Sequence, residues 1–262
     1  MTGEELARDV RNELRELPER AATTMARHLV MAGVLLDEAP EEAYAHAAAA
    51  RSMAPRIGAS REALGLAAYR TGRYAEALTE LRTARRMSGS SAHLPVLADA
   101  ERGLGRPERA IALAGGSEAR GLDREAQLEL RIVAAGARRD LGQPEAAVVT
   151  LQVPELRSER VTPGLARLRY AYADALLAAG RRDEAEMWFA RAAEADVEEE
   201  TDAGERLAEL QGATFVDALD DSLLEDSLPN EADAPAQAGQ PTQRAQPAEI
   251  DVRNGRHDPA GR

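Results

Sequence analysis

The 262-residue sequence contains no cysteine. The chain therefore forms no disulfide, has no thiolate nucleophile and provides no cysteine-based zinc site. Its histidines, His28, His46, His93 and His257, are scattered along the chain, and neither an HExxH nor a P-loop pattern occurs. We therefore expect no enzyme activity, no bound metal and no cofactor.

Aromatic residues and lysine are also scarce. The chain has two Phe, one Trp and five Tyr, and all 33 basic residues are arginine. A single thick core would be short of large side chains, whereas the abundant alanine suits thin, closely packed helices. Few aromatics and a formal net charge of −13 are atypical of nucleic-acid binders, which present basic patches and stacking platforms. Nucleic acid is therefore an unexpected partner.

Long apolar runs are missing as well. No segment approaches the roughly 20 apolar residues that cross a bilayer. The start, MTGEELARDVRNEL, has no basic region followed by a hydrophobic one. We expect a cytoplasmic protein that does not enter a membrane.

Charge is distributed unevenly along the chain. Residues 198–262 contain 16 acidic residues and 5 arginines, whereas residues 1–197 contain 30 acidic residues and 28 arginines. After Pro229 the chain is rich in proline, glutamine and alanine, and it lacks the apolar content that a core requires. We therefore predict a disordered acidic tail over residues 229–262.

An acidic, amphipathic short motif occupies residues 213–228. Its apolar residues recur at about four-residue intervals, and aspartate and glutamate fill the gaps; they are Phe215, Leu219, Leu223, Leu224 and Leu228. One interpretation is a recognition helix that folds on binding. The other is a frayed capping helix or solvated linker, and both remain open.

A pattern recurs about every 34 residues, as the stretch AYRTGRYAEALTELRTA (residues 68–84) illustrates. Each copy has an alanine marker, and the markers are Ala43, Ala77, Ala110, Ala147 and Ala185, separated by 34, 33, 37 and 38 residues. Four of the five markers follow a glycine, which favours the left-handed turn just past a helix end. The prolines in GRPERA and GQPEAA suit the first turn of a following helix. We therefore predict antiparallel helix pairs, with the extra residues in GSEARGLDRE and VPELRSERVTPG lengthening loops.

This pattern resembles the tetratricopeptide repeat (TPR) family, whose unit is two antiparallel helices with small residues at fixed positions. The best copy carries Leu64, Gly65, Ala77, Leu81 and Ala84 after Pro55. The resemblance spans roughly Met25 to Val197. It implies an all-α fold, an α-solenoid of about five TPR-like helix pairs over residues 23–197.

A repeat array needs end caps, because each pair leaves an apolar face that only a neighbour covers. Glu4–Leu17 reads as an amphipathic helix, so residues 1–22 are predicted to be an N-terminal capping helix. Residues 198–212 are predicted to be a C-terminal capping helix, with Leu207 and Leu210 facing the array.

In the TPR family the first helix of each pair lines a groove that faces the ligand. The matching positions of this chain are His28, Leu35, Glu62, Tyr69, Arg70, Arg102, Arg139, Tyr170 and Asp174. The three arginines form either a basic ladder for carboxylates or a set of solvated side chains. Trp188 and Phe189 are expected in the core, with Tyr172 facing the partner helix.

The resemblance implies a non-enzymatic scaffold or adaptor that binds an extended or helical peptide in this groove. We expect an acidic helix as the ligand, with the chain's own residues 214–228 competing for the groove within or between molecules. The family's carboxylate clamp uses lysine and asparagine, which the matching region lacks. Two alternatives are a regulatory sensor for a short peptide or small ligand, gated by the tail, and an accessory subunit of a larger complex.

Overall fold

The structure is a computed structural model that describes residues 3–212. The tail residues Phe215, Leu219, Leu223, Leu224 and Leu228 and the predicted disorder of residues 229–262 lie outside this range. Within it the chain is all-α, with twelve α-helices, two short 3-10 helices and no strand.

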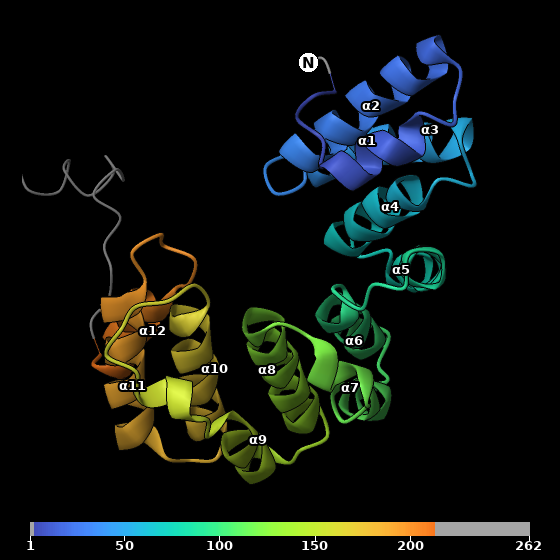
Figure 1. Cartoon of the computed structure of the whole chain (residues 1–262). Coiled ribbons are helices and arrows are strands. Elements are labelled where there is room, and N and C mark those ends of the chain that lie inside the picture. Colours follow the sequence, from blue (N-terminus) through green and yellow to red (C-terminus); the bar gives the residue numbers. More distant parts are fainter. Residues whose placement is uncertain (1–2, 213–262) are drawn as a thin grey trace, which may run out of the picture. The chain divides into compact units, whose positions relative to one another are not determined.

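Five consecutive helix pairs form an α-solenoid, as predicted (Figure 1). The pairs are α2 (Glu19–Val34) with α3 (Pro40–Met53), α4 (Gly58–Arg70) with α5 (Tyr74–Ser88), α6 (Leu94–Gly103) with α7 (Pro107–Ala114), α8 (Arg124–Asp140) with α9 (Pro144–Leu151), and α10 (Leu165–Ala178) with α11 (Arg182–Ala195). Each helix packs on the one before and the one after it, and the first helices of successive pairs also touch. The core is therefore built step by step along the chain rather than around one centre.

The turns within the pairs follow the predicted chemistry. Gly72 and Gly142, which follow α4 and α8, adopt left-handed backbone with φ of 72° and 69°. Pro107 and Pro144 lie in the first turns of α7 and α9, where a missing N–H costs no helical hydrogen bond. The glycine and proline predictions are confirmed.

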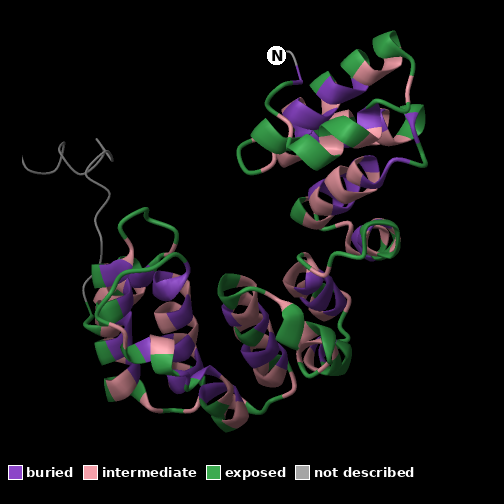
Figure 2. Ribbon diagram, viewed as in Figure 1, coloured by how far each residue is buried: buried purple, intermediate pink, exposed green. Residues whose placement is uncertain are grey.

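Small side chains allow the paired helices to approach closely. Each of the five marker alanines is 0% exposed. A Cβ added at Gly65 of α4 would lie 2.6 Å from Cγ of Leu81 on α5, so only glycine fits there. Figure 2 shows buried residues along the inner sides of the paired helices. The small residues that recur in the sequence thus mark the positions where paired helices pack closely.

The last pair carries four of the chain's eight aromatic residues. Phe189 is completely buried and Trp188 is 9% exposed, so both predicted core positions are confirmed. The ring of Trp188 meets Tyr172 edge-on, with centroids 5.1 Å apart. Tyr172 therefore faces the partner helix, as expected.

The N-terminal helix α1 (Arg8–Leu14) is shorter than the Glu4–Leu17 expected from the sequence. Its buried Leu14 packs with Met25 and Leu29 of α2. Residues before it form turns, and Pro18 separates it from α2, because proline disfavours helix in the residue before it. As a result α2 begins at Glu19, inside the segment expected to be the cap.

At the other end, α12 (Ala203–Leu210) packs on α11. Ala203 is buried, and Leu207 and Leu210 are partly buried against the last pair. Both leucines predicted to face the array therefore do so.

The two stretched spacings hold short 3-10 helices, η1 (Glu118–Gly121) and η2 (Pro154–Arg157). They follow unusually short second helices, since α7 and α9 have 8 residues each whereas α3 and α5 have 14 and 15. None of the helices between residues 3 and 212 has the length and apolarity to cross a bilayer.

Candidate peptide-binding face

Most of the predicted site residues lie on first helices or at their ends. We call the surface formed by α2, α4, α6, α8, α10 and α12 the first-helix face. Tyr69 and Arg70 lie at the end of α4, Arg102 near the end of α6, Arg139 near the end of α8, and Tyr170 and Asp174 on α10. Equivalent helix positions thus recur from pair to pair.

The three arginines are paired with carboxylates of this chain. Arg70 pairs with Asp37, which follows α2, and Arg139 pairs with Asp174. Arg102 lies 2.7 Å from Asp99 and 2.5 Å from Asp140. Asp37, Asp140 and Asp174 each belong to an adjacent repeat. The arginines therefore do not form a free basic ladder but a row of ion pairs that connects repeats, in which Arg70 and Asp37 remain exposed to solvent.

Tyr69 adds a neutral link to this row. Its hydroxyl donates a 2.6 Å hydrogen bond to Asp99 Oδ2 on α6. Burial, reinforced by that bond, raises the pKa of Tyr69 well above its usual value, so the hydroxyl remains a donor. Asp99 therefore accepts from both Tyr69 and Arg102, which fixes α4 against α6.

Four of the predicted residues line one cavity of about 410 Å³: Arg102, Arg139, Tyr170 and Asp174. Ile132, Ala135 and Ala171 supply its apolar surface. Burial, followed by a hydrogen bond to Asp202, raises the pKa of Tyr170 to about 12. The cavity thus joins an apolar surface to side chains that donate and accept hydrogen bonds.

Glu62 lies apart from this group. It lines an apolar cavity of about 160 Å³ with residues of the N-terminal segment and α2, including Leu6 and Leu29. Its carboxylate is 2.9 Å from Nε2 of His93 in the next repeat. Leu35, at the C-terminal end of α2, packs against the core of the first pair. The predicted residues therefore do not form a single cluster.

His28 is engaged inside its own helix pair. Its Nδ1 lies 2.9 Å from Nδ1 of His46 on α3, and the two ring centroids are 5.1 Å apart. One Nδ1 donates and the other accepts. The two histidines, which lie 18 positions apart in the sequence, therefore meet because α2 packs on α3.

The sequence reading missed a buried carboxylate. Glu101 is 1% exposed and lies near Arg82 of α5, Arg106, which precedes α7, and Arg109 of α7. A signal was present, since Glu101 follows Leu94 by seven residues and Leu97 by four and so falls on the buried stripe of α6. A carboxylate on an apolar stripe is uncommon, so the pattern alone does not predict that Glu101 is buried.

Metal ligation finds no support in the part of the chain that the structure describes. No three or more histidine, aspartate or glutamate side chains gather there in a group that could hold a metal ion.

No family model matches the sequence, and no curated protein matches it either. Among solved structures, the crystal structure of a thermophilic TPR protein from Thermus thermophilus is similar, with a TM-score of 0.57 at 20% sequence identity. The match covers 71% of this chain and 98% of that chain. The likeness confirms the TPR fold that the repeat pattern predicts.

Proposed function

We propose that this chain is a non-enzymatic protein-interaction scaffold that binds an extended or helical peptide on its first-helix face. The observation that carries the proposal is the 410 Å³ cavity between α6, α8 and α10. Four residues that the TPR resemblance places in the groove line it. Its volume falls within the roughly 300–1,000 Å³ typical of ligand sites.

The chemistry of this cavity suits a peptide. A peptide backbone offers both N–H donors and carbonyl acceptors. The cavity walls supply the complementary groups, with Arg102 and Arg139 as donors and Asp174 as an acceptor. The apolar surface formed by Ile132 and Ala171 accommodates a side chain of the ligand.

Ion pairing changes the expected charge of this ligand. Arg102 and Arg139 each face a carboxylate of the chain, so their charge is largely balanced. A strongly acidic ligand would have to compete with these internal partners. We therefore propose a peptide of mixed polarity for this face rather than the acidic helix expected from the sequence.

The test is affinity capture from a lysate of the source cells, with the full-length chain as bait and quantification of the captured proteins. Ala171→Arg places a long charged side chain in the cavity, and Ala75→Arg makes the same change at an exposed position of α5. We expect the wild type and Ala75→Arg to retain the same partner and Ala171→Arg to lose most of it. Circular dichroism verifies that both variants fold.

Equal capture by the two variants would contradict the proposal. Failure of the wild type to retain any protein would contradict it as well, because a scaffold requires a partner. If only the wild type retained the partner and both variants lost it, the loss would be caused by an added charge at either position and not by the change in the cavity.

A further inference from the structure

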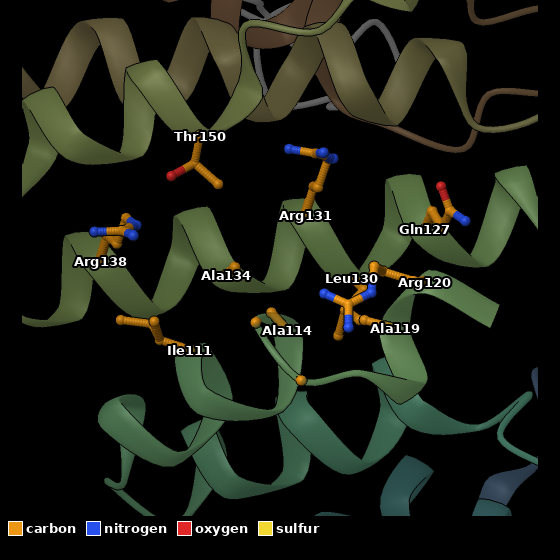
Figure 3. A pocket seen from close by; sticks show the side chains of 12 residues that line it. Ile111, Ala114, Ala119, Arg120, Gln127, Leu130, Arg131, Ala134, Arg138 and Thr150 are labelled. Carbon is orange, nitrogen blue, oxygen red and sulfur yellow. The ribbon is translucent and has the colours of Figure 1, made fainter. Parts of the chain in front are cut away.

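A second cavity opens on another side of α8. It has a volume of about 460 Å³ and is lined by residues of α7, η1, α8 and α9 (Figure 3). The 8-residue helices α7 and α9 are too short to cover the 17-residue α8. Gly115 and Gly116 follow the end of α7 and line the cavity. The gap therefore results from truncated second helices.

The arginines of this cavity lack internal partners. Arg120, Arg131 and Arg138 line it, and none of their guanidinium groups makes an ion pair or hydrogen bond within residues 3–212. The Nε atom of Arg138 is buried without an acceptor. No acidic residue is among the twelve that line the cavity. The arginines Arg70, Arg102 and Arg139 of the first-helix face, by contrast, each pair with a carboxylate.

One oxygen of a nearby carboxylate, Glu155 Oε1, is already engaged, whereas Glu155 Oε2 is buried without a hydrogen-bond partner. Glu155 of η2 accepts from Arg124, and this hydrogen bond is the largest cause of its lowered pKa, with a smaller contribution from Arg131. The positive charge of Arg131 therefore acts on Glu155, although the two side chains form no ion pair. A cavity with three unpaired guanidinium groups attracts anions, because guanidinium binds carboxylates through charge-assisted hydrogen bonds.

The spacing of the arginines limits the shape of the ligand. Arg131 and Arg138 are seven residues apart on α8, which is about 10.5 Å along the axis at 1.5 Å per residue. Leu130, Ala134 and Ile111 give the space between them an apolar surface. A peptide in the polyproline II conformation rises about 3.1 Å per residue and has three residues per turn, so acidic residues three positions apart lie on the same side and span about 9 Å.

We propose that this cavity is a second binding site, which takes an acidic peptide segment of a partner protein with its apolar side chains between the carboxylates. We call it the α8 arginine site. Nucleic acid fits less well, since the cavity has no aromatic side chain for base stacking and the chain carries a net charge of −13. Figure 3 also shows the polar side chains of Thr150 and Gln127, which line the cavity but already donate to Ala146 O and Leu122 O.

The test is fluorescence anisotropy with the full-length chain and a labelled 12-residue peptide, (Glu-Ser-Leu)₄. The matched peptide (Gln-Ser-Leu)₄ has the same length and apolar content without the charge. We expect the acidic peptide to bind, its affinity to fall as salt screens the charges, and the neutral peptide to bind at least tenfold more weakly.

The variant Arg131→Gln with Arg138→Gln should weaken binding of the acidic peptide at least tenfold. Its control is Arg20→Gln with Arg27→Gln, which removes two exposed arginines likewise seven residues apart, on α2. Arg131→Gln alone changes only an exposed side chain and should weaken binding several-fold. It keeps the test valid should the double variant unfold.

Equal losses in the α8 and α2 double variants would overturn the proposal, as would equal binding of the two peptides. Competition with inorganic phosphate separates the sources of the anion. Displacement of the peptide at equal concentrations would indicate a site for a small oxyanion and would also overturn the proposal. Ala171→Arg should leave this binding unchanged, so the two proposed sites fail or succeed separately.

Discussion

Arg138 and Arg139 are neighbours in the sequence, yet only Arg139 has a partner. Arg139 Nη1 donates to Asp174 Oδ2 on α10, whereas Nε of Arg138 is buried without an acceptor. Successive residues of an α-helix point about 100° apart, so the two side chains leave α8 on different sides. Helix α8 therefore contributes Arg139 to the first-helix face and Arg138 to the α8 arginine site.

The two arginines should differ in their effect on stability. We expect Arg139→Gln to lower the free energy of unfolding by about 1 kcal/mol, because Asp174 loses a charge-assisted hydrogen bond at a partly exposed site. Arg138→Gln should change it by less than about 0.5 kcal/mol, since no partner is lost. Urea denaturation of both variants measures the difference. Equal effects would mean that the ion pair does not stabilise the repeat junction.

Removal of the buried carboxylate should be more costly. Glu101→Ala leaves a cavity and removes the carboxylate of Glu101 from Arg82 and Arg106. We expect a loss of about 2–3 kcal/mol in unfolding free energy, less than for a fully buried pair because the arginines are partly exposed and become solvated. Glu108→Ala, an exposed change on α7, is the control and should cost little. Thermal and urea unfolding compare the two.

Two glycines should respond in opposite directions to the same change. Gly65→Ala should destabilise the chain by about 1–2 kcal/mol, because its Cβ would lie 2.6 Å from Cγ of Leu81. Gly33→Ala should stabilise it by about 0.5–1 kcal/mol, because its Cβ meets nothing within 4 Å and alanine favours helix. Melting temperatures of the two variants provide the measurement. A stabilised Gly65 variant would show that α4 and α5 separate at no cost.

Stability should also depend on the ionisation of Glu129 on α8. Burial raises the pKa of Glu129 above its usual value, although Arg167 opposes the shift. Its stabilising contribution is therefore complete below the pKa of the unfolded chain and is lost as the pH rises through the folded-state pKa. Glu129→Gln should gain stability relative to the wild type as the pH rises above about 4, the usual pKa of a glutamate.

The control for Glu129 is Glu145→Gln, an exposed change on α9. We expect its stability relative to the wild type to stay nearly constant over the same range. Chemical denaturation at several pH values gives both curves. Parallel curves for the two variants would contradict the assignment.

Helix pairing was predictable because it depends on local chemistry. Gly72 and Gly142 mark left-handed turns, Pro107 and Pro144 mark helix starts, and each signal acts within a few residues. The length of α1 was less predictable, since its apolar spacing extends beyond the residues that are helical. Trp188 was assigned to the core because the repeat places a large residue near that position.

The sequence by itself determined the five helix pairs, their order and the buried alanine faces, because these features repeat with a period visible in the chain. Only the tertiary structure decided which charged groups meet. Asp174 lies 35 residues from Arg139, and His28 lies 18 residues from His46. A periodic pattern places a side chain on a helix face. Its partner depends on how long the neighbouring helices are and how closely they pack. The short lengths of α7 and α9 for the same reason leave the nearby arginines unpaired.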